Sequence, residues 1–249
     1  MAVRFNGNGE YLIQSDVVGA FNYNDAYTLM AWYYPVTIST GNNFGFLWVA
    51  NAALTAYDTI GQMKTTSGSD LFVQDSVSGF SEAGTTVSTA TWHHTAMVRH
   101  SSSLFRGYWN GAQFASDGTG DVSGRAAAER IMIGNPSGAA YINSRFAHAK
   151  LWRVGLSPEE IRREMWSIAP VTNLAHVVSW WPIMSDDRKL SYGGGYPLTE
   201  NGTLSDEADP GIAWKVAKPK PHVWWIPPPA VTTSIIPLVR HHMAQQGMA

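Results

Sequence analysis

The chain has 249 residues, of which 14% are charged and 12% aromatic, and its formal net charge is −2. This near-neutral balance gives no overall basic field, which argues against nucleic acid as a partner. The absence of cysteine excludes disulfides and thiolate metal sites, and no apolar run is long enough to suggest a membrane partner. At this length one globular domain with a tail is expected, and the low share of charged residues predicts a mostly neutral surface.

Strand patterns begin at the N-terminus. Residues 2–6 and 11–14 read as two short strands joined by a Gly-Asn-Gly turn. Residues 27–36 (YTLMAWYYPV) are apolar on both faces, so this strand is predicted to be central or covered on both sides. Further strands are predicted at 44–50, 57–63, 71–77, 130–134, 145–154 and 174–183.

The stretch 91–116 carries the clearest hairpin pattern. Residues 92–99 alternate with the two-residue period of a half-buried strand, and a Ser-rich turn follows. A second strand then stops at Asn110 and Gly111, a pair that favours the positive φ angles of a tight turn. Three successive antiparallel strands are predicted here, and they favour a β-sandwich.

One helix is predicted. Ser157 stands at the N-cap, Pro158 at the first helical position and Glu160 three residues after the cap, which is the pattern of a capping box. Ile161 and Met165 lie four residues apart and can pack on the sheet. We expect a helix of about ten residues without a catalytic side chain.

The last 36 residues differ from the rest. Residues 214–249 contain three Lys, one Arg and no acidic residue, which leaves 13 basic and 19 acidic side chains in residues 1–213. We therefore predict a domain at 1–213 and an extended, Pro/Trp-rich basic arm at 214–249. The arm either wraps over its own domain or binds a neighbouring subunit. Its candidate partner-binding residues are Trp214, Trp224, Trp225, Ile236, Leu238 and Arg240.

Several segments resemble the motifs of one fold family. They are VRFNGNGEYLIQ, YTLMAWYYPV, TWHHTAMVR with GYWNGAQ, RIMIGN, FAHAKLWRVGLSPEEI and LAHVVSWWPI. Together they resemble the laminin G-like jelly roll of the concanavalin A-like lectin/glucanase superfamily, over about residues 2–205. The resemblance implies an all-β, two-sheet antiparallel jelly-roll sandwich with one concave sheet, whose concave face or rim carries ligands or partners. The scaffold serves several functions, so the fold alone assigns none.

Catalytic and metal patterns are weak. The E-x-D-x-x-E strand of the glucanase branch does not occur, so no enzyme is expected. The histidines at positions 93, 94, 100 and 148 are interpreted as structural. Asp25, Asp58 and Asp117 are placed in turns, where calcium sites can occur in the family, but they are not clustered within one loop. No cofactor is therefore expected, and calcium is kept only as an alternative.

Aromatic side chains are the remaining binding signal, because their faces can stack on sugar rings. The candidate glycan contacts are Trp48, Tyr57, Trp109 and Tyr141. Most of the other aromatic residues are expected to fill the sandwich.

The resemblance extends to structural proteins of tailed-phage virions, where such domains decorate capsids or form parts of tails and fibres. We therefore expect a non-enzymatic virion protein, made in the host cytoplasm without a signal peptide, that docks on other virion proteins through its arm. A homo-oligomer or larger assembly and a host-surface glycan are the expected partners. The alternative is a free carbohydrate-binding lectin, with or without calcium.

Overall fold

The computed structural model describes most of the first 210 residues. The described residues are 2–6, 9–15, 17, 25–37, 44–65, 68–76, 79–114, 117–118, 121–123, 128–136, 143–183, 189–193, 195–208 and 210. The chain separates into two compact units, Met1–Ile212 and Ala213–Ala249. The predicted arm and its six candidate residues lie outside the described part, so the predictions made for them stay predictions.

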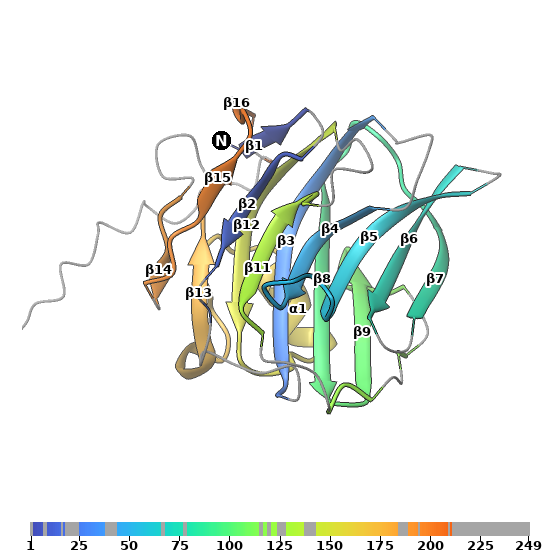
Figure 1. The fold of residues 1–249 in the computed structure, drawn as a ribbon, viewed down its shortest axis with the longest axis vertical. Helices are drawn as coiled ribbons and strands as arrows, with labels where there is room; N and C mark the ends of the chain where they lie inside the picture. The colour runs from blue at the N-terminus through green and yellow to red at the C-terminus, as the bar shows by residue number, and fades with distance from the viewer. Residues whose placement is uncertain are drawn as a thin grey trace, which may run out of the picture. The chain divides into compact units, whose positions relative to one another are not determined.

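Two antiparallel sheets form the body (Figure 1). Sheet A contains, in spatial order, β10 (Ala112–Gln113), β9 (Leu104–Trp109), β8 (His93–Ser101), β3 (Tyr27–Thr37), β12 (Asn143–Trp152), β1 (Ala2–Phe5) and β16 (Ser205–Glu207), with β13 (Val177–Trp181) beside β12 and β14 (Tyr192–Gly193) beside β13. Sheet B contains β15 (Thr199–Asn201), β2 (Tyr11–Gln14), β11 (Arg130–Gly134), β4 (Phe44–Ala50), β5 (Tyr57–Thr65), β6 (Gly68–Asp75) and β7 (Gly79–Thr86). The predicted all-β jelly-roll sandwich is confirmed.

The core lies between the two sheets. Tyr33 of sheet A stacks on Phe46 of sheet B with ring centroids 4.3 Å apart, and Phe146 lies 5.2 Å from Tyr33. The Tyr33 hydroxyl donates a hydrogen bond of 2.7 Å to Gln62 Oε1, so its polar end is satisfied inside the core. As predicted, β3 is central in its sheet and covered on both faces, because a helix packs on the other side.

That helix is α1 (Pro158–Glu164). The predicted capping box is present: Ser157 Oγ accepts from the backbone N–H of Glu160, and the Glu160 carboxylate accepts from the backbone N–H of Ser157. The helix has seven residues rather than about ten. At its end, the Glu164 carboxylate accepts hydrogen bonds from the backbone N–H groups of Val171 and Thr172, which hold the following segment against the helix.

The tight turn at Asn110 and Gly111 is confirmed, with φ angles of 51° and 79°. A methyl group on Gly111 would meet the side chain of Arg162, whose guanidinium also donates to the Gly111 carbonyl at 3.2 Å. Glycine is therefore required here twice, for its positive φ angle and for the close approach of α1.

One predicted strand needed correction, and β7, β14, β15 and β16 were not predicted. Residues 174–183 were predicted as one strand, but Leu174–His176 form a 3-10 turn (η1) and β13 covers Val177–Trp181. Asn173 has a left-handed φ of 47°, which starts this turn. β7 was not predicted, because its sequence GFSEAGTT contains one large apolar residue and lacks the alternation of a half-buried strand.

Candidate functional site on the outer face of sheet B

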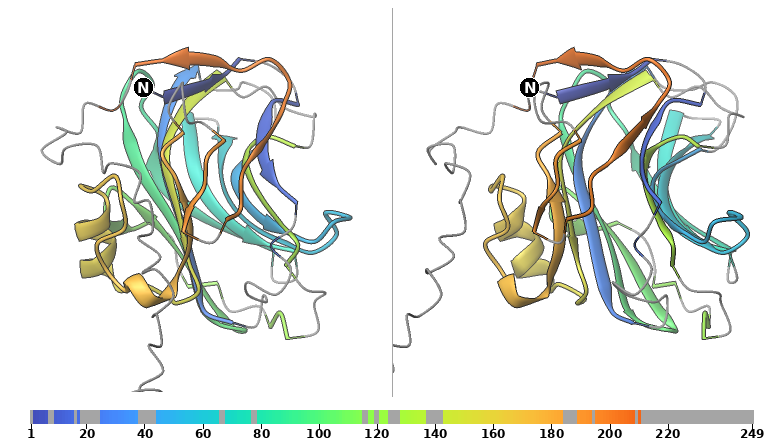
Figure 2. Two further views of the ribbon diagram at one scale, coloured as in Figure 1. Left: turned by 90° about the vertical axis from the view of Figure 1, so that its left-hand side faces the viewer. Right: turned by 60° about the vertical axis from the view of Figure 1, so that its left-hand side comes forward.

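The outer faces of the two sheets differ. Figure 2 shows α1 packed on sheet A, on the side away from sheet B. Side chains of β3, β8, β9 and β12 meet the helix there in a buried apolar cluster. Its fully buried members are Met30, Ala96, Val98, Tyr108, Trp152, Leu156 and Ile161. The outer face of sheet A under the helix is therefore part of the core.

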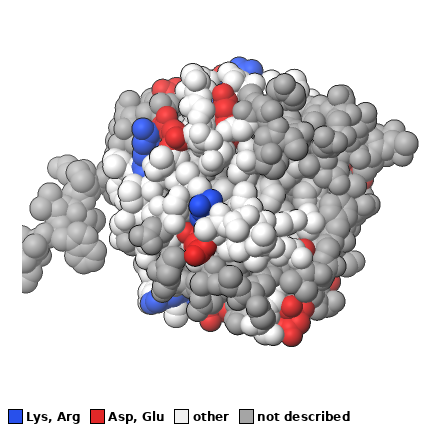
Figure 3. Space-filling view, in the orientation of Figure 1, with Lys and Arg blue, Asp and Glu red and all other residues white. Residues whose placement is uncertain are grey.

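Sheet B has no described helix on its outer face. In Figure 2, β4 and β5 bend away from sheet A towards their lower ends, so this outer face lies on the inside of the bend. Sheet B lies in front in Figure 1, and the same view in Figure 3 shows that the described surface here is mostly uncharged. A neutral, curved sheet surface matches the binding face implied by the sequence resemblance.

Strand alternation identifies the outward side chains. Leu47 and Val49 of β4, Ile60 of β5 and Ile131 and Ile133 of β11 belong to the core cluster. The residues between them point outward, because successive side chains of a strand face opposite sides. Four of these outward residues stand side by side across the sheet by strand register: Ile13, Met132, Trp48 and Thr59. Met132 and Thr59 are only 1% exposed, so the half-buried Ile13 and Trp48 supply the accessible surface of this row.

Trp48 and Tyr57 form an aromatic pair on this face. Both side chains are half-buried, their ring centroids are 5.3 Å apart, and the ring planes meet at 62°. Thr59 donates its hydroxyl proton to the Leu47 carbonyl at 2.9 Å, so its polar atom is satisfied beneath the pair. The pair offers two aromatic faces at an angle, a geometry suited to holding a sugar ring.

Two glycines make room for this pair and its neighbour. Gly45 and Gly61 stand opposite one another on β4 and β5. A methyl group on Gly45 would collide with the Trp48 ring and the Thr59 hydroxyl, and one on Gly61 would collide with the Phe44 carbonyl and the Phe72 ring. Because residue 45 has no side chain, the Trp48 indole can lie against the β4 backbone.

The other two predicted glycan contacts, Trp109 and Tyr141, are not on this face among the described residues. Trp109 is only 7% exposed, belongs to the core cluster, and stacks on His93 with centroids 4.5 Å apart. The prediction that it contacts a glycan was wrong, because a buried ring has no free face for a sugar. Tyr141 lies outside the described residues, so that prediction stays open.

Arg130 was missed by the sequence analysis. It opens β11 opposite Ala50 of β4, and Ala50 in turn stands opposite Tyr57 of β5. The signal was present in the sequence, since inward Ile131 and Ile133 place Arg130 on the outward side. The face thus carries one half-buried guanidinium beside the aromatic pair.

The predicted structural histidines are buried or half-buried. His93 Nε2 lies 3.1 Å from the Ser88 carbonyl oxygen and its Nδ1 lies 3.3 Å from the Asn110 amide. Burial, together with the charge of Lys150, lowers the pKa of His94 to about 3. Neither imidazole is placed for acid–base chemistry near neutral pH, because His93 is held by backbone and amide groups and His94 is neutral.

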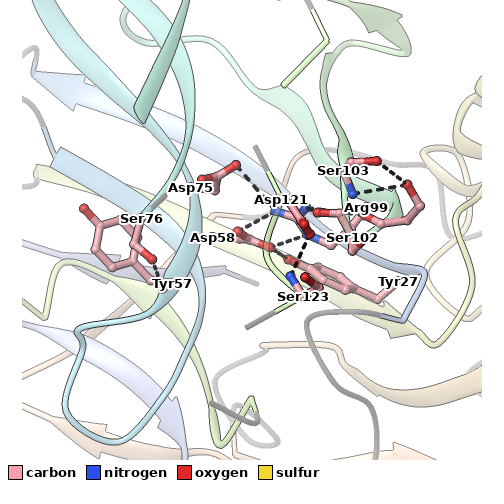
Figure 4. A network of polar contacts seen from close by, with 11 residues as sticks. Tyr27, Tyr57, Asp58, Asp75, Ser76, Arg99, Ser102, Ser103, Asp121 and Ser123 are labelled. Atoms are coloured by element: carbon pink, nitrogen blue, oxygen red, sulfur yellow. Dashed lines mark hydrogen bonds and ion pairs between the residues drawn. The ribbon is translucent and has the colours of Figure 1, made fainter. Parts of the chain in front are cut away.

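Of the three aspartates expected in calcium-type turns, Asp25 is exposed in a bend, whereas Asp58 and Asp117 bind arginine side chains. Asp58 lies in β5 rather than in a turn, fully buried, and accepts two hydrogen bonds of 2.7 Å from Arg99. Figure 4 shows Arg99 between Asp58 and Asp75, with the Tyr27 hydroxyl also on Asp58. This network joins β8 of sheet A to β5 and β6 of sheet B, so it is structural.

Asp117 binds Arg106 at 2.8 Å and Gln113 at 2.8 Å on the surface. Among the described residues, no group of three or more His, Asp or Glu side chains is arranged to hold a metal ion. The same part of the chain has no helix long and apolar enough to cross a membrane. The predictions about cofactors stay predictions.

The two antiparallel sheets, one of them curved, form a lectin-type jelly roll. Residues 6–162, more than half of the sequence, match the laminin G-type family described as the Concanavalin A-like lectin/glucanases superfamily. The chain belongs to this family. No curated protein matches the sequence.

Solved structures share the fold at low identity. A heptameric SAP-like pentraxin from Limulus polyphemus has 13% identity and a TM-score of 0.52, covering 82% of this chain and 93% of the pentraxin. A putative carbohydrate binding protein from Bacteroides ovatus has 14% identity and a TM-score of 0.60, covering 83% of this chain and 60% of that protein. A Trypanosoma rangeli sialidase has 16% identity and a TM-score of 0.52, covering 65% of this chain and 26% of the sialidase. This chain thus spans a minor part of the enzyme.

Proposed function

We propose that this protein is a non-catalytic carbohydrate-binding domain that holds a glycan on the outer face of sheet B. The observation that carries the proposal is the half-buried Trp48–Tyr57 pair, with ring planes at 62° on a mostly uncharged sheet surface. Aromatic faces stack on the C–H faces of sugars, and a small number of polar groups around them gives orientation.

Two further findings support the proposal. A structure with the same fold is described as that of a putative carbohydrate binding protein, although at 14% identity the likeness concerns the fold. The sequence also lacks the E-x-D-x-x-E carboxylate pattern of the glucanase branch. Binding without hydrolysis is the function that fits both.

The virion role is a second candidate, and the sequence alone supports it. Residues 214–249 carry four basic and no acidic side chains, and they include Trp214, Trp224 and Trp225. Such an arm suits docking on a partner protein, with the jelly roll displayed outward. Glycan binding by the body and docking by the arm are compatible, because they use different parts of the chain.

A glycan array with the full-length protein tests the first proposal. We expect signal on a restricted set of glycans, and loss of that signal in Trp48→Ala. The matched control is Trp166→Ala, since Trp166 is 67% exposed and lies beside Trp32 of sheet A. Array signal that survives Trp48→Ala, or no signal from the folded wild-type protein, would overturn the proposal.

A further inference from the structure

Arg130 stands out among the described arginines by its lack of a carboxylate partner in a half-buried position. Five others form ion pairs: Arg4, Arg99, Arg106, Arg145 and Arg162. Two more, Arg153 and Arg163, are exposed on the surface. Arg130 makes no hydrogen bond or ion pair with the described residues, although its surroundings remove part of its contact with water.

The outward side chains around Arg130 are uncharged, and the carboxylate of the preceding residue, Glu129, accepts a hydrogen bond from the backbone N–H of Ala52 rather than from Arg130. On β2, β11, β4 and β5, the other described side chains that point outward are uncharged, including Tyr11, Ile13, Met132 and Thr59. No carboxylate of the described residues pairs with this guanidinium, so its positive charge remains available to an anionic ligand. Its five N–H donors are fixed in a planar fork, which matches the two oxygens of a carboxylate.

The position of Arg130 relative to the aromatic pair is set by strand register. Arg130 and Tyr57 stand on either side of Ala50, one strand away from it on each side. Neighbouring strands are about 4.8 Å apart, so the two backbone positions are about 10 Å apart. Trp48 is the diagonal neighbour of Arg130, at about 7–8 Å between backbone positions. A sugar ring stacked on Trp48 can therefore direct a substituent to the Arg130 fork.

We propose that Arg130 makes this face selective for acidic glycans, by binding the carboxylate of a uronic or nonulosonic acid residue whose ring stacks on Trp48. This inference rests on the proposed glycan-binding function and adds the chemical class of the ligand. The recognised group is the carboxylate itself, so its methyl ester should be a poor ligand.

The test uses the full-length protein on an array in which each acidic glycan is paired with its methyl ester. We expect at least tenfold stronger binding to the acids than to the esters. In Arg130→Gln the acids should fall to the level of the esters, while binding to the esters is retained. Arg130→Lys should give an intermediate preference, because it keeps the charge but loses the fork.

A matched control is Arg153→Gln, which removes an exposed arginine elsewhere and should leave the preference intact. All variants should melt at the wild-type temperature, since Arg130 has no described partner to lose. Equal binding of acids and esters, or an acid preference that survives Arg130→Gln, would overturn the inference while the glycan-binding function stands. Stronger binding to sulfated than to carboxylated glycans would overturn the carboxylate assignment. No Trp48-dependent binding to any glycan would overturn the proposed function itself.

Discussion

The outer face of sheet A and the outer face of sheet B contain similar residue types but have different surroundings. On sheet A, Trp152 is fully buried beneath α1, and its indole N–H donates to the Thr172 carbonyl at 3.1 Å. On sheet B, Trp48 is half-buried beside Tyr57, with no described helix over it. Tryptophan on a strand is thus a core residue or a candidate ligand contact depending on what covers its sheet.

A buried ion pair holds the cover of sheet A in place. Lys150 of β12 binds the Glu164 carboxylate at 2.8 Å, and its ammonium also donates to the carbonyls of Glu164 and Ser167. Both side chains are at most 2% exposed. The charge on sheet A is therefore neutralised inside the protein, whereas Arg130 on sheet B has no such partner.

The largest effect is expected where this buried pair is broken. Glu164→Gln leaves the Lys150 ammonium buried without a carboxylate, which should lower the free energy of unfolding by about 3–5 kcal/mol. Urea denaturation measures it. The matched control is Glu159→Gln, which removes the exposed partner of Arg162 and should cost less than about 1 kcal/mol. Similar losses of stability in the two variants would show that the buried Lys150–Glu164 pair contributes no more than the exposed Arg162–Glu159 pair.

Gly45→Ala tests whether glycan binding depends on the position of the Trp48 indole on the outer face of sheet B. The added methyl group collides with the Trp48 ring, so it should displace the indole and cost about 1–3 kcal/mol of stability through overpacking. Glycan binding should be lost with it. Gly107→Ala is the control, because its methyl group collides with the Val73 and Phe114 side chains rather than with Trp48. Calorimetric titration of the two variants should give binding only to Gly107→Ala; equal binding would show that the position of the indole is unimportant.

Acid should destabilise the covered face. Burial holds the pKa of His94 at about 3, below its ordinary value of 6.5. Between these values the unfolded chain takes up a proton that the folded chain does not, so stability falls as the pH falls. The loss attributable to His94 at pH 5 is about 2 kcal/mol. Urea titrations at pH 7 and pH 5 should show a smaller loss in His94→Gln than in the wild type. If His94→Gln loses as much stability between pH 7 and pH 5 as the wild type, groups other than His94 cause the acid sensitivity.

The smallest effect concerns the start of the covering helix. Ser157→Ala removes the side-chain oxygen that accepts from Glu160 N–H at 3.3 Å, which should cost about 1 kcal/mol. The melting temperature reports this loss. Glycan binding at sheet B should be unchanged, since the cap lies on the other sheet. A change in glycan affinity would mean that the two faces are coupled.

Local patterns predicted the fold well. The capping box at Ser157 and the turn at Asn110 and Gly111 depend on residues that are adjacent in sequence, and the structure confirms both. β7 could not be predicted because its pairing with β6 involves residues without a hydrophobic pattern. Caps and turns can be predicted from neighbouring residues, whereas a strand without a hydrophobic pattern forms because of the strand it pairs with.

The site was harder to predict because burial depends on contacts distant in sequence. Trp48 and Trp109 both looked like candidate stacking residues, but Trp109 shares the parity of buried Phe105 on β9 and points into the core. Arg130 was passed over as the polar start of an apolar strand. Its significance comes from what surrounds it on β4 and β5, which the sequence of β11 does not contain.

The proposed function requires that a glycan contacts Trp48 on the outer face of sheet B. The most direct test is a two-dimensional NMR titration of the indole N–H signals with the strongest glycan from the array, with Trp48 assigned from the spectrum of Trp48→Phe. We expect the Trp48 signal to shift while those of Trp152 and Trp166 stay in place. A static Trp48 signal with a shift at Trp166 would place the glycan on the side of sheet A and rule out binding at Trp48.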